Sequence, residues 1–100
     1  MTAEKIHAGV ELALADMTGR GWLAENCFIS PDETALPTVE LRLASGRYDC
    51  VVVGAGVRLP PSRLRLFEAL VNAIHHAAPQ TAIAFNSRPD DSGAAAARWI

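Results

Sequence analysis

The residues best suited to bind a ligand follow two apolar runs of the sequence. Residues 50–53 (CVVV) lead into the turn 54–58 (GAGVR), and residues 81–86 (TAIAFN) lead into Ser87 and Arg88. A Gly-x-Gly turn between a buried strand and a helix opens the dinucleotide-binding fingerprint, in which three glycines bring the backbone close to a pyrophosphate. The first question is therefore whether this turn binds a nucleotide.

The rest of the fingerprint is missing. Leu59 stands where the third glycine belongs, and Pro60 and Pro61 delay the helix whose amides would meet the phosphates. The next strand ends in residues 85–87 (FNS), without the acidic residue that binds the ribose, and no Gly-Lys-Ser/Thr sequence follows the turn. We therefore expect no cofactor, and we interpret Gly54 and Gly56 as residues that permit a tight turn.

A smaller anion is a better candidate ligand. In an open parallel sheet, ligands bind outside the carboxyl ends of the strands, where we expect the loops 30–34, 54–62 and 86–91 to meet. Two arginines and helix N-termini at this edge could bind a phosphate or a carboxylate. The candidate residues of this anion pocket are Ser30, Gly54, Gly56, Arg58, Asn86, Ser87 and Arg88. In the alternative, both arginines are solvated and pair with nearby acidic residues: Asp32, Glu33, Asp90 or Asp91.

The other reactive residues suggest no catalytic site. His75 and His76 are adjacent, so on a helix they point about 100° apart and cannot share one metal ion; we expect no metal site. Cys27 and Cys50 lie within apolar runs, which predicts reduced, buried and unpaired thiols. No base can be assigned to a nucleophile, so catalytic residues are unknown. An enzyme acting at the same edge and an oligomeric interaction protein stay as alternatives to a ligand-binding domain.

Composition limits the partners and the compartment. The chain of 100 residues is long enough for one domain, 1–100, and its 50% apolar and 20% charged residues are typical of a globular protein. The formal net charge is -2 and the basic residues are scattered, which argues against binding to nucleic acid. The sequence contains neither an apolar run long enough to cross a membrane nor a signal peptide, so we expect a cytoplasmic protein.

Hydrophobic periodicity predicts an α/β domain. Strands are expected at 24–30, 49–54 and 81–86, and helices at 3–18 (with Thr2 as its cap), 35–45, 62–77 and 91–99. This alternation favours a small three-layer αβα domain, Rossmann-like or flavodoxin-like, with a short and mainly parallel sheet of about three strands.

One of these elements is ambiguous. Val39, Leu41 and Leu43 alternate with polar residues as in a strand, whereas Leu36, Val39 and Leu43 also share one face of a helix. We favour the helix because the flanking strands look buried on both faces, and parallel strands need a crossover between them.

Residues 48–99 (YDCVVVGAGVRLPPSRLRLFEALVNAIHHAAPQTAIAFNSRPDDSGAAAARW) resemble a group of small bacterial α/β proteins with a Gly-Ala-Gly-x-Arg turn and no established activity. Residues 2–22 are similar as well, whereas Asn26, Pro37 and Arg42 depart from the pattern. The resemblance implies a flavodoxin-like or Rossmann-like fold whose first strand, ahead of the helix at 3–18, is missing here. A narrow sheet with unpaired edges favours association, so we predict a homodimer with a mainly apolar interface.

Overall fold

We describe residues 3–100 of the protein from a computed structural model. Five α-helices, one short 3-10 helix and two strands follow one another within these residues. In order they are α1 (Ala3–Gly19), α2 (Ala35–Ala44), β1 (Cys50–Val53), α3 (Ala55–Arg58), η1 (Pro61–Arg63), α4 (Leu64–Ala77), β2 (Ala82–Phe85) and α5 (Ser92–Ala97). None of the helices in this part of the chain is long and apolar enough to cross a membrane.

The sheet consists of β1 and β2, which are parallel and are joined by α4. Cys50 is paired with Ala82 and Val53 with Phe85, so the two strands are in register over their full length. Four-residue strands of apolar and β-branched residues suit this position because helices cover both of their faces. The predicted parallel arrangement of the strands at 49–54 and 81–86, with a helix between them, is therefore confirmed. The helix expected at 35–45 is present as α2, but it does not join two paired strands.

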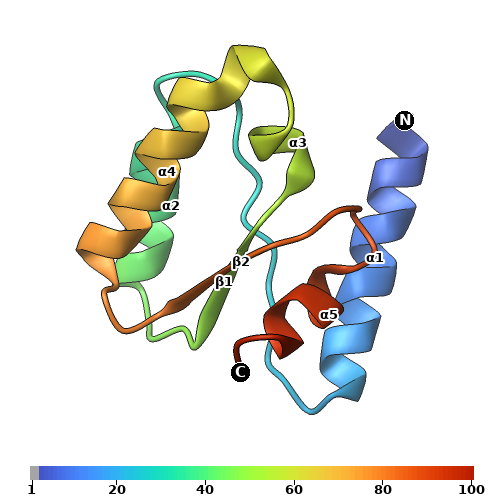
Figure 1. Ribbon diagram of the computed structural model, residues 1–100. Helices are drawn as coiled ribbons and strands as arrows, with labels where there is room; N and C mark the ends of the chain where they lie inside the picture. Colours follow the sequence, from blue (N-terminus) through green and yellow to red (C-terminus); the bar gives the residue numbers. More distant parts are fainter. Residues whose placement is uncertain (1–2) are drawn as a thin grey trace.

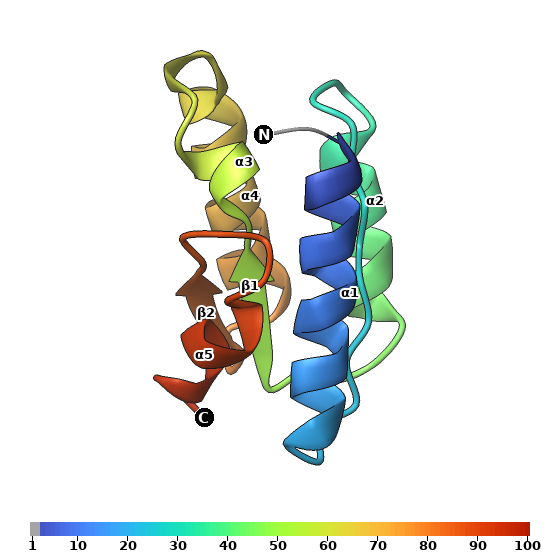
Figure 2. The ribbon, with the colours of Figure 1, turned by 90° about the vertical axis from the view of Figure 1, so that its right-hand side faces the viewer.

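The helices form two layers around the sheet. Helices α2 and α4 lie on one side of the strands, and α1 and α5 lie on the other (Figures 1 and 2). Two glycines permit the close packing of α1 against the C-terminal part of the chain. A Cβ on Gly9 would lie 2.7 Å from the Cβ of Pro89, and one on Gly93 would lie 2.0 Å from a carboxylate oxygen of Asp16.

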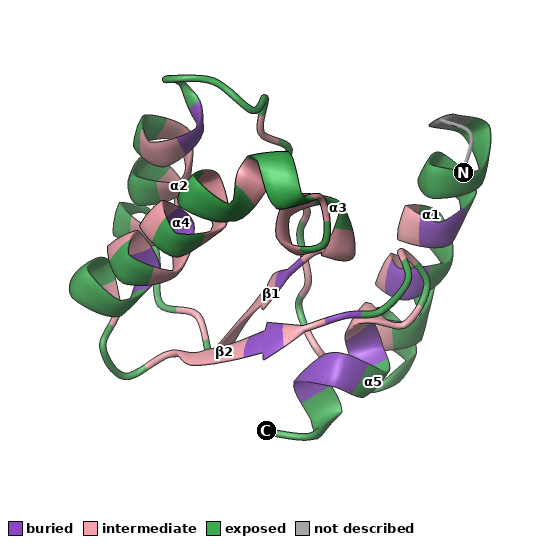
Figure 3. Cartoon of the chain, turned by 45° about the horizontal axis from the view of Figure 1, so that its top comes forward, coloured by how far each residue is buried: buried purple, intermediate pink, exposed green. Residues whose placement is uncertain are grey.

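The core is concentrated around β1, β2 and the helices that touch them. Its buried side chains include Val53, Leu70, Ile74, Ala84 and Ala95, and the purple segments in Figure 3 cluster in this region. The rings of Phe67 and Phe85 extend the core in an edge-to-face contact, with centroids 5.6 Å apart. Small side chains on α5 let this helix approach the sheet closely.

Most of the predicted elements are present. The helices expected at 3–18 and 35–45 and the strands at 49–54 and 81–86 agree with α1, α2, β1 and β2 within one residue or two. The helix expected at 62–77 is split into η1 and α4, and α3 was not predicted. The proposed cap Thr2 lies outside the described residues, whereas Gly21 ends the first helix region with a positive φ of 85°.

The prediction of a third strand at 24–30 is wrong. Residues 22–30 are extended, but within the described chain they form no backbone ladder with either strand. The sheet therefore has two strands instead of three. The sequence pattern predicted a strand here, but pattern alone does not supply a hydrogen-bonding neighbour.

The predicted burial of the cysteines is only partly correct. Both thiols are free, but Cys27 is exposed and Cys50 is half-buried. Burial, together with the negative charge of Asp49, raises the pKa of the Cys50 thiol. Cys27 is exposed because the segment that carries it lies outside the sheet.

Candidate functional site

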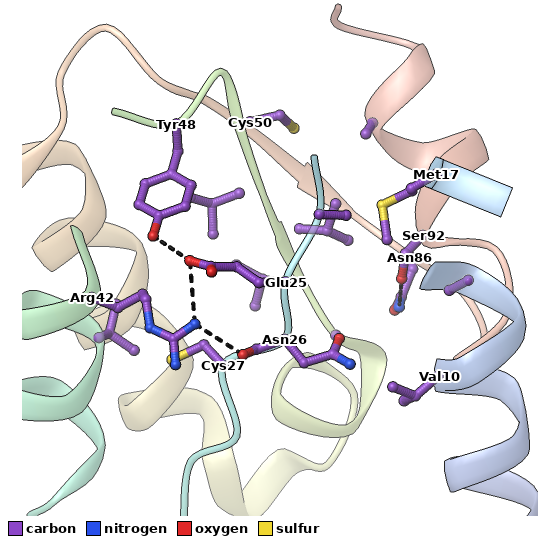
Figure 4. A pocket seen from close by; sticks show the side chains of 18 of the residues that line it. Val10, Met17, Glu25, Asn26, Cys27, Arg42, Tyr48, Cys50, Asn86 and Ser92 are labelled. Atoms are coloured by element: carbon purple, nitrogen blue, oxygen red, sulfur yellow. Dashed lines mark hydrogen bonds and ion pairs between the residues drawn. The ribbon is translucent and has the colours of Figure 1, made fainter. Parts of the chain in front are cut away.

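A cavity of about 860 Å³ lies between β1 and the extended segment 21–29. One wall is the open edge of β1, and the opposite wall is the extended segment. Val10, Ala13 and Met17 of α1 cover one side, and Val39 and Leu43 of α2 together with Leu70 and Ile74 of α4 cover the other. Figure 4 shows part of this lining.

This cavity is partly open to solvent, and its lining is largely apolar. Water in such a space has few polar partners. The side chains around the cavity therefore leave apolar surface uncovered within the described chain.

The backbone of β1 presents unused hydrogen-bonding groups to this space. The amide of Ala82 donates to the carbonyl of Asp49 at 3.0 Å, which fixes the phase of the ladder. Because the backbone groups of successive residues point to opposite sides of a strand, Val51 and Val53 face β2. Cys50 and Val52 then direct their amides and carbonyls toward the cavity, and no backbone partner for them occurs among residues 3–100.

A polar cluster closes one end of the cavity and fixes the extended segment (Figure 4). Arg42 lies 3.3 Å from a carboxylate oxygen of Glu25 and donates to the carbonyl of Asn26 at 3.1 Å. The hydroxyl of Tyr48 donates a hydrogen bond to Glu25. This hydrogen bond, and to a smaller extent the charge of Arg42, holds the pKa of Glu25 below its ordinary value. The segment is thus tied to α2 by side chains and not to β1 by its backbone.

Asn86 organises the carboxyl end of the two strands. Its side chain is 6% exposed; it accepts a hydrogen bond from the amide of Ala55 at 2.7 Å and donates one to the Ser92 hydroxyl at 3.0 Å. The backbone carbonyl of Asn86 accepts a hydrogen bond from the Arg58 guanidinium at 2.8 Å. The amide that opens α3, where a phosphate would bind in a nucleotide fold, therefore already has a partner within the protein.

The structure brings three of the predicted anion-pocket residues together: Gly54, Arg58 and Asn86. Gly54 and Gly56 line the cavity, but neither has a positive φ and a Cβ on either would meet no atom within 4 Å. Their backbone conformations and surroundings therefore do not require glycine at either position, so the interpretation that they permit a tight turn stays a prediction. Arg58 packs over the ring of Phe85 at 5.8 Å from its centroid, and its buried Nε has no hydrogen-bond partner among residues 3–100.

The remaining predicted residues lie apart from the cavity. Ser30 is exposed and does not line it. The amides of Ser87 and Arg88 donate to the carboxylate of Asp91 at 3.0 and 3.1 Å, and Arg88 pairs with Asp90 at 3.0 Å. For this arginine, the alternative of an ion pair within its own loop describes the structure.

The cluster of Glu25, Arg42 and Tyr48 was not among the predicted site residues. Arg42 and Tyr48 lie 17 and 23 positions after Glu25 along the chain. A signal was nevertheless present, because Asn26 and Arg42 were two of the three departures from the group that the sequence resembles. These two residues are in contact with each other.

Comparisons with protein families, with curated proteins and with solved structures found no match. The resemblance noted from the sequence therefore stays a prediction. The fold and the site define a small α/β domain with a two-stranded parallel sheet and an apolar cavity at the open edge of that sheet.

Proposed function

We propose that this protein is an interaction domain that binds a segment of another polypeptide in the cavity beside β1. The observation that carries this proposal is the cavity itself, which has apolar helices on two sides and an unpaired strand edge as a wall. Open strand edges bind other chains through their backbone groups, and exposed apolar surface favours association.

Exposed side chains beside the cavity support the proposal. Leu23 is fully exposed, and Phe28 is 68% exposed although it stands in an apolar stretch of the sequence. Both belong to the extended segment that forms one wall. A partner in the cavity would cover this segment and give its apolar side chains a neighbour.

A matched pair of variants on α1 tests this function. Ala13 is buried and lines the cavity, so Ala13→Phe fills part of it, whereas Leu12→Phe changes an exposed position on the same helix. Immobilised peptides of about ten residues, ranging from apolar to polar, serve as probes. The proposal expects wild type and Leu12→Phe to bind apolar peptides and Ala13→Phe to lose binding. Absence of binding by wild type, or equal binding by all three proteins, would contradict it.

The homodimer that the sequence predicts is a second form of association, and it does not require a strand of the second copy in the cavity. An isologous contact over Leu23 and Phe28 would bury the largest exposed apolar side chains of the extended segment. A stable dimer is expected to bury on the order of 1,200 Å² or more in total. Light scattering that gives a mass near 10.7 kDa at every concentration would rule out the homodimer but not a different polypeptide partner.

A second candidate function is the binding of a small anion at the carboxyl end of β1. The observation that favours it is the buried Nε of Arg58, which has no hydrogen-bond partner among the described residues. A phosphate or carboxylate that displaced the contact between Arg58 and Asn86 would use this donor. Thermal unfolding with inorganic phosphate is expected to show a higher Tm for wild type and no change for Arg58→Ala. An unchanged Tm for wild type would remove this candidate.

A further inference from the structure

We propose that the segment taken up by the cavity is a β-strand that lies between β1 and residues 22–30, runs parallel to β1 and is apolar on both faces. This inference rests on the proposed function and specifies its partner. Four observations carry it: the free backbone groups, the direction of the two walls, the character of the two covering layers, and the pairing of this chain's own strands.

The free backbone amides and carbonyls on both walls can form hydrogen bonds with a strand along its length, which a compact ligand cannot do. Cys50 and Val52 direct their amides and carbonyls into the cavity, while residues 23–29 have no backbone-to-backbone hydrogen bond within the described chain. Neighbouring strands lie about 4.8 Å apart, so one inserted strand would bond to β1 on one side and to the extended segment on the other. Insertion would turn two strands into a four-stranded sheet.

The two walls fix the direction of the inserted strand. Residues 22–30 and β1 run the same way, from the end of the molecule where α1 finishes to the end where α2 begins (Figure 2). Helix α2 connects the extended segment to β1, and α4 connects β1 to β2. All three extended elements are therefore arranged as strands of one parallel sheet, and a strand between two of them continues that sheet in the parallel direction.

The covering helices fix the composition of the inserted strand. One layer presents Val10, Ala13 and Met17 of α1, and the other presents Val39 and Leu43 of α2. Strands of parallel sheets that are covered on both faces are continuous apolar runs instead of alternating ones. The partner is therefore a run of about five Val, Ile or Leu residues, the usual length of a strand.

A second copy of this chain does not offer such a strand without losing its own sheet. The two apolar runs that form strands, 50–53 and 82–85, are already paired with each other. The remaining extended segment contains the polar residues Glu25 and Asn26. The carboxylate of Glu25 is already bound by Arg42 and Tyr48. The inserted strand consequently comes from a polypeptide segment outside residues 1–100.

The test uses the intact chain and two synthetic peptides of about ten residues. The first has a central run of Val and Ile, and the second has Glu at every second position of that run. We expect the first peptide to bind at least about tenfold more tightly, because a charge on either face would be buried against α1 or α2. Equal binding of both peptides would overturn the proposal.

Hydrogen exchange and spin labels test the geometry in the wild-type chain. The apolar peptide is expected to protect the amides of Cys50 and Val52. A label on its C-terminus is expected to broaden the amide signals of Gly54 and Gly56, and a label on its N-terminus those near Asp49. Unchanged exchange at Cys50 and Val52, or the reverse pattern of broadening, would contradict a parallel inserted strand.

The variant Val52→Pro provides an independent check, because it removes an amide that faces the cavity and leaves the ladder to β2 intact. It is expected to abolish peptide binding while keeping the helical circular dichroism of wild type. If the apolar peptide does not bind while the chain binds other polypeptides or itself, the inserted strand is wrong and the interaction function stands. If no polypeptide binds, both fail.

Discussion

The two edges of β1 differ in almost every respect although they belong to the same four residues. Toward β2 the strand has a regular ladder and a neighbour in register, and Val53 of β1 and Ala84 of β2 are buried. Toward residues 22–30 it has a cavity, and the segment across that cavity is held by the side chains of Arg42 and Tyr48. The two edges therefore differ in packing, and we expect the stability of the fold to be concentrated on the β2 side.

The largest expected effect comes from a buried side chain of α4. Ile74 is 2% exposed, and its replacement by alanine removes buried apolar contacts and enlarges the cavity that Ile74 also lines. Ile74→Ala should lower the free energy of unfolding by about 2–5 kcal/mol, measured by urea titration. Leu23→Ala is the matched control on the opposite side, where the side chain is fully exposed. A similar loss in both variants would show that the two sides do not differ in stability.

The next largest effect concerns the residue that joins the ends of the two strands. Asn86→Ala removes the acceptor for the Ala55 amide and the donor to Ser92 in buried surroundings. Leaving these groups without partners should cost about 1–3 kcal/mol in the same titration. Ser87→Ala, an exposed change at the neighbouring position, is the control and should unfold like wild type. If Asn86→Ala also unfolds like wild type, then Asn86 is not what holds the turn at Ala55.

The two cysteines lie on opposite walls of the cavity, Cys27 on the extended segment and Cys50 on β1, so their reaction rates compare how accessible the two walls are. The thiolate is the reactive form, and the raised pKa of Cys50 keeps it protonated at a pH where an ordinary thiol ionises. Exposed Cys27 should therefore react faster with a thiol reagent than half-buried Cys50, and raising the pH should accelerate the reaction of Cys50. Single variants Cys27→Ser and Cys50→Ser assign the two rates. Faster labelling of Cys50 would mean that its wall of the cavity is the more open one.

The comparison of the two edges also shows what the sequence could predict. Residues 49–54, 62–77 and 81–86 follow one another in a pattern that local periodicity describes, and they form the β2 side as expected. Ile6, Val10, Ala13 and Met17 share one face of α1 at helical spacing, but all four line a cavity instead of covering a third strand. Whether an extended segment becomes a strand depends on a neighbour that is distant in sequence, and periodicity carries no information about that neighbour.

The candidate site could be predicted only for residues whose place follows from the end of a predicted strand. Asn86 and Arg58 follow directly from the ends of their strands, and the structure brings them together. Ser87 and Arg88 lie equally close to the end of a strand, yet their backbone amides donate to the carboxylate of Asp91. The sequence alone does not show which acidic residue accepts these hydrogen bonds. The contacts of Glu25 depend on how α2 packs, so they required the three-dimensional arrangement.

The smallest expected effect comes from the cluster of Glu25, Arg42 and Tyr48, which links the extended segment to α2 and to the residue two positions before β1. The pKa of Glu25 is lowered in the folded protein, so its contribution to stability is present above the ordinary pKa of a glutamate and is lost as the pH falls through the lowered value. Removing the carboxylate with Glu25→Gln should therefore reduce the free energy of unfolding slightly at neutral pH, and the difference from wild type should shrink as the pH falls through the lowered pKa. The effect is small because the pair is exposed.

Urea titrations of Glu25→Gln and wild type at several pH values measure this difference. Glu33→Gln removes the same charge from an exposed neighbouring loop and controls for net charge. A difference between Glu25→Gln and wild type that persists at acidic pH would mean that the carboxylate is not its source. A difference confined to higher pH would show that the segment opposite β1 is held by a weak, titratable contact. Such a contact can yield when a strand enters the cavity, whereas the ladder between β1 and β2 cannot yield without unfolding the core.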